Sequence, residues 1–494
     1  FTKIKEAMQA VDIDMYAECF ILFDECEKLV QDVHYRDSIR EPMNDFFRFR
    51  DKALISATPI VPEKDNRFDG FTRVLIQPDY AYQQKLKLIT TNNVLATLQE
   101  VIEAKRGTVC IFCNSIDSID SFYRLIPELN NACTFCSEDG QYKLWKGNRR
   151  KKSIMITELE RYNFFTSRFY SAVDIVCKNP PHVILISDLY GATQSVIDPA
   201  TEAIQIIGRF RGGVNTVTHI ASIRPDLECM SANEIDSWIE GAASIFNGWK
   251  KQLARTSNIG ERTLLQEAIG ENSYLPYLDA NGKPDPFLIA NLYEKEQVKR
   301  LYTSADLLCN AYQQTDYFAF SHEERLMPVS DNERMAIQHR LAKKKRAQLI
   351  VHKLEEMEKM SRATDKKLQK RYQRMLGNLI TTTTDRYLYD CFCRFGGDFI
   401  RESDYNENKL RTALNVSSEH TIKQSGQMKI SIQRTFPIDS ELSVQEAKSM
   451  LKQVYKKMGL NTERGITTKE LEQYAEVEKG WKHDNRTIKI LKFK

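Results

Sequence analysis

The chain has 494 residues, 42% hydrophobic and 28% charged, which is ordinary for a globular protein and long enough for about three domains. Its 71 basic and 67 acidic residues leave a formal net charge of +4, so nucleic-acid binding would need a local basic surface. No run approaches the roughly 18 apolar residues of a membrane span, and the opening FTKIKEAMQA lacks the apolar region of a signal peptide. The 11 cysteines lack the spacing of small secreted proteins, which predicts a reducing cytoplasm.

Short apolar runs separated by helical patterns dominate the first half of the chain. ECFILF (18–23) and DKALISAT (51–58) both end in polar residues. Four further strand or strand–helix units follow: GTVCIFCNS (107–115), SIMIT (153–157), HVILISD (182–188) and TEAIQIIG (201–208). Because apolar runs with helices between them are typical of buried parallel sheets, we expect one partial and one complete α/β domain here.

The second half is predicted to be mainly α-helical. From about residue 246 strand signals are rare, and long charged stretches have helical periodicity. The clearest stretch, 331–379, holds no proline and no glycine before Gly377, so it predicts a long helix or a helix pair. LDANGKPDPF (278–287) is typical of a connecting turn. Residues 431–494 are predicted to form a small helical module with one short terminal strand, TIKILKF.

Two adjacent carboxylates, Asp24 and Glu25, end the first apolar run. At the end of a strand, the Asp can hold Mg²⁺ through its water shell and the Glu can orient and deprotonate an attacking water. The same pair also suits the first turn of a helix, where the helix dipole stabilises negative charge. This stretch alone leaves both interpretations open.

Two hydroxyls end the second apolar run, where Ser56, Ala57 and Thr58 precede Pro59. Ligands of parallel sheets bind outside the carboxyl ends of the strands, so these side chains are candidates for a ligand site. The alternative is a simple exit from a strand into a turn, which the proline favours equally.

Two later segments carry polar residues at regular spacing. Thr166 lies eight residues before Asp174 in FTSRFYSAVDI, and Gln205, Arg209 and Arg211 lie within seven residues in QIIGRFRGG. Arginines placed in this way can reach a phosphate on a neighbouring domain, as arginine fingers do. The alternative is a basic helix end closed by a Gly-Gly cap.

Taken in order, these segments resemble the motifs of superfamily 2 helicases and translocases over roughly residues 10–225. The resembling segments are DECE (24–27, motif II or Walker B), SAT (56–58, motif III), TVCIFCNS (108–115, motif IV), TSRFYSAVD (166–174, motif V) and QIIGRFR (205–211, motif VI). The Gly-Arg-x-Arg form of the last segment is similar to that of herpesvirus origin-binding helicases. Ala172 stands where many motifs V have glycine, and Gly212 stands where many motifs VI have their second arginine.

The resemblance implies two RecA-like parallel-sheet domains that bind ATP and Mg²⁺ between them and nucleic acid, DNA rather than RNA, across them. By this resemblance, Asp24 would bind Mg²⁺ through the water shell of the ion, and Glu25 would be the base that activates the attacking water. The resemblance directs Gln205, Arg209 and Arg211 toward the γ-phosphate.

Further roles also follow from the resemblance. Ser56, Ala57 and Thr58 would couple the nucleotide state to domain closure. The residues expected to contact the nucleotide or the nucleic acid are Asn114, Thr166, Ser167, Asp174 and the basic cluster Arg149, Arg150, Lys151 and Lys152. That cluster, in GNRRKKS, can neutralise phosphates along a nucleic-acid track, or it is a solvated loop.

One expected motif is absent. The Gly-x-x-x-x-Gly-Lys-Ser/Thr loop that cradles phosphates does not occur, and the single Gly-Lys pair, Gly282-Lys283, is followed by Pro284. Only 23 residues precede Asp24. We therefore expect the first RecA-like domain to be incomplete, with the loop on roughly a hundred or more further N-terminal residues; the rival is a degenerate motor.

Two other signals favour ordinary structure. Cys110-x-x-Cys113 and Cys133-x-x-Cys136 approach a zinc-ribbon spacing, but the first pair lies in an apolar strand, where positions three apart face opposite sides. Buried cysteines filling a core are the preferred interpretation. The basic run AKKKRA (342–347) is followed by acidic residues, which favours a solvated helix face.

The sequence thus predicts an incomplete RecA-like domain (1–90), a second RecA-like domain (91–245), a helical accessory region (246–430) and a small helical module (431–494). The expected activity is that of an ATP-dependent nucleic-acid helicase or translocase, with protein partners for the helical half and no membrane. The alternative is a non-catalytic nucleic-acid-binding or assembly module that keeps the helicase architecture.

Overall fold

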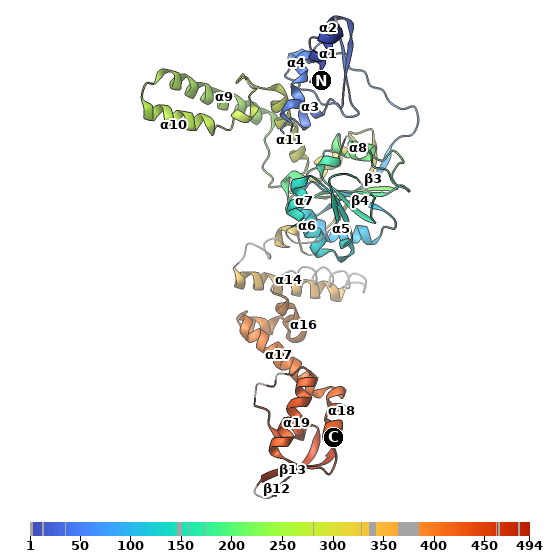
Figure 1. Ribbon diagram of the computed structural model, residues 1–494, viewed down its shortest axis with the longest axis vertical. Coiled ribbons are helices and arrows are strands. Elements are labelled where there is room, and N and C mark those ends of the chain that lie inside the picture. The colour runs from blue at the N-terminus through green and yellow to red at the C-terminus, as the bar shows by residue number, and fades with distance from the viewer. Residues whose placement is uncertain are drawn as a thin grey trace. The chain divides into compact units, whose positions relative to one another are not determined.

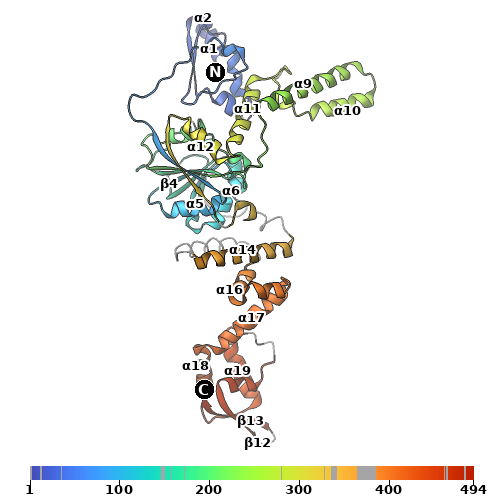
Figure 2. The same cartoon turned by 180° about the vertical axis from the view of Figure 1, so that it is seen from behind.

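The computed structural model separates into two units, residues 1–335 and 336–494, and each is described by itself (Figures 1 and 2). The described residues are 3–11, 14–34, 36–145, 151–156, 158–171, 173–279, 281–327, 329–334, 342–363, 385–460, 462, 465–482 and 485–494. No helix among these residues is long and apolar enough to cross a membrane.

A parallel sheet of eight strands dominates the first unit. Its strands lie in the order β10-β3-β9-β8-β4-β7-β5-β6, and all neighbouring strands are parallel. The strands are β3 (Gln84–Thr91), β4 (Val109–Phe112), β5 (Cys133–Phe135), β6 (Lys151–Ser153), β7 (Tyr162–Phe165), β8 (His182–Ser187), β9 (Thr216–Ser222) and β10 (Phe318–Arg325). The expected α/β class with a large parallel sheet is therefore present.

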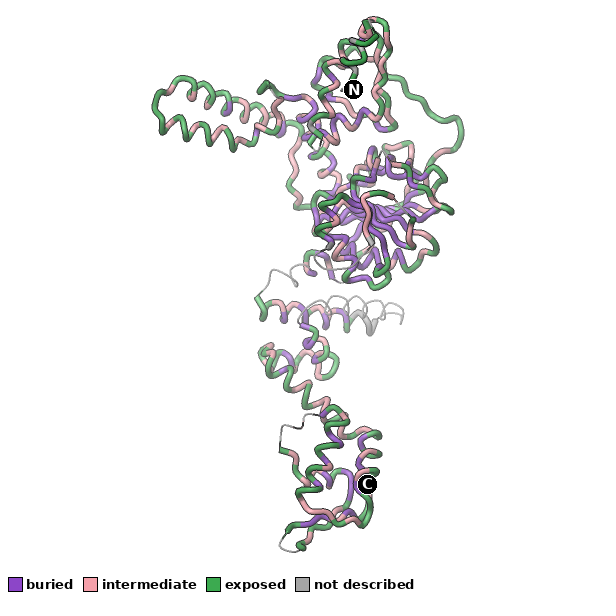
Figure 3. Tube along the Cα trace, viewed as in Figure 1, coloured by how far each residue is buried: buried purple, intermediate pink, exposed green. Residues whose placement is uncertain are grey.

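The sheet is covered on both faces, which explains its unbroken apolar strands (Figure 3). Every residue of β4, VCIF, and of β8, HVILIS, is buried. One face carries α5 (Val94–Glu103) and α6 (Ile116–Leu125), whose apolar side chains share a core with alternate strand residues. The other face carries α8 (Glu202–Gly208) and α12 (Ala305–Gln313). The helix α7 (Glu138–Trp145) connects β5 to β6.

The sheet extends past the expected domain boundary at residue 245. Strand β10 (Phe318–Arg325) pairs with β3, although it lies in the region predicted to be a helical accessory. The segment 201–208, predicted as a strand or strand–helix unit, forms the helix α8. The strand expected over 153–157 overlaps β6 (Lys151–Ser153) only at Ser153. Strand β10 was missed because all of its last five residues are polar or charged.

A separate two-stranded parallel sheet carries the first two apolar runs. Strand β1 (Phe20–Asp24) pairs with β2 (Asp51–Ile55), in register from Phe20 with Asp51 to Asp24 with Ile55. One side packs on a core of aromatic and aliphatic residues from α3 (Lys28–Gln31) and α4 (Pro42–Phe46). The short helices α1 (Ile4–Val11) and α2 (Met15–Glu18) precede it.

These two strands are not the buried strands that the sequence predicts. Phe20 is 63% exposed, Leu22 50% and Ile55 47%. A pair of strands has only one face covered by the neighbouring helices, so the alternate side chains of an apolar run lie in solvent.

The helix α11 (Pro286–Leu301) joins the two cores of the first unit. Phe287 and Leu288, at its start, belong to the core beneath β1 and β2, and Val298, near its end, belongs to the core of the large sheet. The Asn291 amide donates to the carbonyl of Val30 at 2.8 Å. Between β9 and α11, the helices α9 (Ala232–Arg255) and α10 (Ile259–Gly270) lie side by side as a hairpin (Figures 1 and 2).

The second unit begins with helices and ends in a mixed module. The helices α14 (Lys343–Ala363), α16 (Arg386–Glu402) and α17 (Glu407–Gln424) come first. The predicted helical run 331–379 is thus described as a helix over Lys343–Ala363, and 335–341 and 364–384 lie outside the described residues.

The terminal module has more strand than predicted. It contains α18 (Gly426–Thr435), α19 (Val444–Lys457) and an antiparallel sheet of β11 (Glu441–Ser443), β13 (Asn485–Phe493) and β12 (Ala475–Lys482), in that order. A core of buried residues between Met428 and Ile490 holds it together. The predicted terminal strand TIKILKF lies in β13, whereas its partner β12 was missed because most residues of β12 are exposed, which weakens the apolar alternation.

Candidate functional site

Asp24 and Glu25 lie where the small sheet ends. Asp24 is the last residue of β1 beside Ile55 of β2, and the amide of Cys26 donates to the carbonyl of Ile55 at 3.3 Å. The ends of the two strands therefore bring Asp24–Glu27 next to Ser56–Thr58, as parallel pairing requires. The motif II and motif III segments of the sequence are neighbours for this reason.

The backbone at Glu25 has an unusual conformation. Its φ is +53°, in the left-handed region that non-glycine residues rarely adopt. The amide of Glu25 donates to Oδ1 of Asp24 at 2.9 Å, which holds the turn. Such backbone strain clusters at functional sites, where the surrounding structure fixes it. Here it reverses the chain directly after β1, with the Glu25 side chain 31% exposed.

The helix α8 brings two further side chains to this turn. Gln205 and Arg209 are four residues apart and so lie on one helix face. The Gln205 amide donates to Oε2 of Glu25 at 3.3 Å and to Oγ1 of Thr58 at 3.0 Å. A guanidinium nitrogen of Arg209 lies 3.8 Å from Oε1 of Glu25. Residues separated by about 180 positions thus form one cluster.

Arg209 is held in place by its own helix. Its Nε donates to the carbonyl of Gln205 and a second guanidinium nitrogen donates to Oε1 of Gln205, both at 3.1 Å. Arg209 is 9% exposed and Gln205 3%. The guanidinium is therefore positioned before any ligand is present, which limits the entropy lost when it binds an anion.

Glu27 is a cluster member that sequence reasoning missed. It is fully buried, and its Oε1 accepts from the Gln205 amide at 3.3 Å. Oε2 has no hydrogen-bond partner among the described residues. Removal from water raises the pKa of Glu27 to about 7, with a smaller opposing effect from a hydrogen bond of Ser56. The available signal was the last residue of DECE, which is the third acid of that segment, but nothing in the sequence shows that this acid is buried.

Ser56, Ala57 and Thr58 differ in their surroundings. Oγ of Ser56 accepts from the amide of Thr58 at 2.9 Å, and Thr58 is buried against Gln205. Ala57 is exposed. Thr58 therefore connects the end of β2 to α8, and Ser56 holds the backbone of Thr58 in place.

Asp24 fits one mode of Mg²⁺ binding. Its side chain is exposed, and one carboxylate oxygen already accepts from Glu25. Among the described residues there is no group of three or more acidic, histidine or cysteine side chains that could hold a metal. Mg²⁺ in nucleotide sites commonly uses one or two carboxylates together with substrate phosphates, so a single exposed aspartate suits it.

The motif V residues lie at the end of a strand of the large sheet. Thr166 directly follows β7, is largely buried, and donates through Oγ1 to the carbonyl of Phe135 at 3.5 Å, while Ser167 is exposed. Asp174 accepts from Nε of Arg211 at 3.0 Å in a solvent-exposed pair. This pair engages Arg211, which was expected to face the γ-phosphate.

Within the described part of the chain, the remaining predicted contact residues make no contact with the Glu25 cluster. The Asn114 amide donates to the carbonyl of Gln194 at 3.4 Å, and Nζ of Lys152 donates to the carbonyl of Gln141 at 2.9 Å. Lys151 lies in β6, and its side chain is outside the described part. Arg149 and Arg150, like Ala172, also lie outside the described residues.

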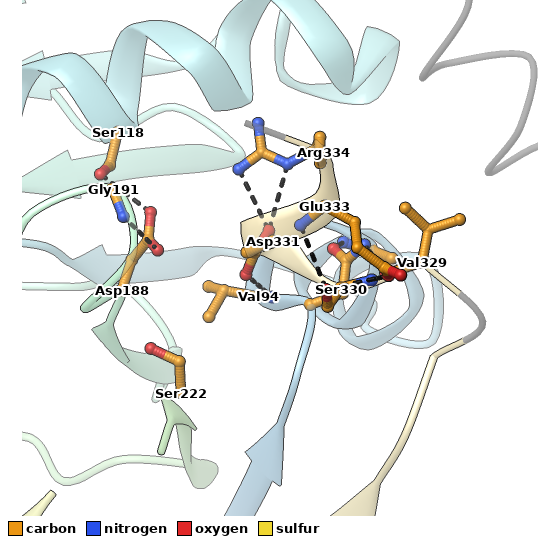
Figure 4. A network of polar contacts seen from close by, with 12 residues as sticks. Val94, Ser118, Asp188, Gly191, Ser222, Val329, Ser330, Asp331, Glu333 and Arg334 are labelled. Atoms are coloured by element: carbon orange, nitrogen blue, oxygen red, sulfur yellow. Dashed lines mark hydrogen bonds and ion pairs between the residues drawn. The ribbon is translucent and has the colours of Figure 1, made fainter. Parts of the chain in front are cut away.

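A second polar network lies at the carboxyl end of the large sheet (Figure 4). Oδ2 of Asp331 accepts from the amide of Val94 at 2.7 Å, so it caps the start of α5, and its Oδ1 accepts two donors of Arg334 at 3.1 Å. Burial raises the pKa of Asp331 to about 6 despite the nearby guanidinium. Asp188 accepts from Ser118 at 3.0 Å in the same region. The cap anchors the segment after β10 to the β3–α5 turn.

The four cysteines with zinc-like spacing are all buried. Cys110 belongs to the core on one face of the large sheet and Cys113 to the core on the other. The pair in β4 thus has the opposite orientations that strand geometry predicts.

Two comparisons with known proteins found no match. No family model matches the chain, and no curated protein matches it. The assignment of function therefore depends on the geometry of the cluster formed by Asp24, Glu25, Glu27, Thr58, Gln205 and Arg209.

Proposed function

We propose that the chain belongs to an ATP-dependent nucleic-acid helicase or translocase, in which ATP is hydrolysed at the Glu25–Gln205–Arg209 cluster. The observation that supports this most strongly is the approach of Arg209 to within 3.8 Å of Glu25, with Gln205 bonded to both Glu25 and Thr58. Folding alone does not require an acid, an amide and a buried arginine to meet at the ends of strands.

The roles proposed for these side chains follow from their chemistry. Glu25 accepts the proton of the attacking water, because its carboxylate is partly exposed beside the strand ends where ligands of parallel sheets bind. Arg209 stabilises the charge that develops on the transferred phosphoryl group. Gln205 links Glu25 and Arg209 to Thr58, so a change in the bound nucleotide would be passed to the end of β2. When bound, Mg²⁺ neutralises phosphate charge beside Asp24.

The test is hydrolysis by the longest natural form of the protein, measured with DNA and with RNA. Glu25→Gln is expected to lower kcat by about 10²–10⁴ while nucleotide binding persists, since it removes only the base. Arg209→Ala is expected to cost about 10³ or more, the scale of an arginine finger. Glu267→Gln and Arg262→Ala, on exposed positions of α10, are the matched controls and should leave the rate unchanged.

A non-catalytic assembly module is the second candidate, favoured by the absence of any Gly-Lys-Ser or Gly-Lys-Thr triplet in the 494 residues. For such a module Glu25→Gln would alter neither nucleotide turnover nor binding of partners. No hydrolysis by the longest form with either nucleic acid would refute the motor and support the module.

A further inference from the structure

The exposed face of α19 in the terminal module carries a row of lysines. Lys448, Lys452 and Lys456 are four residues apart and all exposed. At a rise of about 1.5 Å per residue, their Cα atoms are spaced by about 6 Å along the helix axis. Three cations therefore stand in a nearly straight line about 12 Å long.

These lysines have no acidic partner in the part of the chain that the structure describes. Among the described residues, no ion pair involves Lys448, Lys452 or Lys456. Other lysines of the same module are paired: Lys479 with Glu472, Lys482 with Glu441 and Lys489 with Asp439. The charge of the α19 face is consequently not neutralised from within the described module, unlike that of Lys479, Lys482 and Lys489.

The side chains between the lysines are polar and uncharged. Gln445, Ser449 and Gln453 are exposed on the same side of α19. The acid near the start of the helix, Glu446, is used in a capping box, since its carboxylate accepts from the amide and the hydroxyl of Ser443. Lysine, glutamine and serine are the side chains that contact phosphates and base edges in protein–DNA interfaces.

The apolar side of α19 is fully used by the fold. Ala447, Leu451, Val454 and Tyr455 are buried in the core of the module against α18 and the sheet. A helix that lies on a membrane needs an exposed apolar side, which this helix lacks. The core also fixes the axis of α19, so the spacing of the three lysine Cα atoms is set before binding.

We propose that the α19 face binds the phosphate backbone of a nucleic-acid duplex. A straight, rigid helix bearing lysines and amides fits the major groove, which is wide enough to admit an α-helix. The inference goes beyond the proposed function, because binding at this module needs no nucleotide hydrolysis. It gives the terminal module a nucleic-acid contact outside the cluster around Glu25.

The experiment measures binding of the full chain to a fluorescein-labelled DNA duplex of about 24 base pairs across a series of salt concentrations. Each lysine–phosphate contact contributes about 0.9 to the slope of log K against log salt. The triple variant Lys448→Gln, Lys452→Gln and Lys456→Gln is expected to bind more weakly and to reduce the slope by about 2.7, the value for three contacts. Circular dichroism checks that the variant is folded.

The matched control neutralises three lysines of the same module that already have acidic partners. Lys479→Gln, Lys482→Gln and Lys489→Gln changes the net charge equally and is expected to reduce the slope by less than about 1. Equal effects of the two triple variants would overturn the proposal, as would an unchanged slope in the α19 variant. Tighter binding to a single strand of the same length, or equal binding to anionic vesicles, would also overturn it.

The duplex-binding assay can fail or succeed independently of the ATP-hydrolysis assay that tests the proposed function. Glu25→Gln should keep the full slope in this assay. A reduced slope in the α19 variant, in a protein whose longest form hydrolyses no ATP, would refute the motor and support duplex binding.

Discussion

Replacing Glu27 by glutamine tests whether a buried carboxyl group lies inside the candidate site. The side chain is fully buried, one carboxyl oxygen lacks a partner among the described residues, and burial raises its pKa from 4.5 to about 7. One pKa step is worth 1.36 kcal/mol, so ionising this group in the folded protein costs about 3 kcal/mol well above pH 7. Screening by the surrounding polar groups reduces this to roughly 2 kcal/mol.

The direction in which stability changes with pH follows from the number of protons that each state binds. Because the folded pKa is the higher one, the folded state binds more protons between about pH 4.5 and 7, and stability is lost as the pH rises through that window. Glu27→Gln has no proton to lose and can still accept from Gln205. Its stability relative to the wild type should be near zero at pH 4.5 and rise to roughly 2 kcal/mol at pH 8.

The assay is hydrogen exchange of peptides spanning residues 20–58, read by mass spectrometry at pH 5 and pH 8, with rates corrected for intrinsic exchange. Protection should increase in the variant at pH 8 and much less at pH 5. Glu267→Gln, on an exposed face of α10, is the control and should change neither. An equal gain at both pH values would refute the assignment of a raised pKa to Glu27.

Two further predictions concern the large sheet. Burial lowers the pKa of His219 to about 3, so the folded state excludes the proton and stability is lost as the pH falls below 6.5. His219→Asn should flatten the decline in unfolding free energy between pH 6.5 and 5, worth about 2 kcal/mol, in urea titrations; an unchanged decline contradicts it. Asp331→Ala should destabilise α5 by about 3–5 kcal/mol, since it removes the cap on Val94 and leaves Arg334 buried without its partner. Faster exchange of amides in 94–103 checks this, and wild-type exchange there would refute it.

The parts of the fold visible from the sequence are those governed by local patterns. The apolar runs at 20–24 and 182–187 end in polar residues, and both are strands with those residues at their ends. The pairing of Asp24 with the end of β2 follows from parallel geometry. The burial of Glu27 could not be predicted, because the Gln205 amide that covers it comes 178 residues later.

Strands with charged faces escaped prediction for a related reason. The edge strand β10 carries Glu323, whose carboxylate pairs with Lys87 on the neighbouring strand β3. In the sequence, a charged side chain that pairs with a residue on the neighbouring strand looks the same as a charged side chain on the exposed face of a helix. Strand β12, which also escaped prediction, has the same property, with Lys482 paired to Glu441 on β11.

The position of α11 limits how the candidate site can open. One end of this single helix is embedded with Phe287 in the core below Glu25, and the other with Val298 in the core below Arg209. Movements in which both ends rotate together leave the packing intact. A movement that separates Glu25 from Arg209 has to extract one end or bend the helix, at about 1.5–3 kcal/mol per buried apolar side chain. The helix α11 therefore resists any movement that separates Glu25 from Arg209.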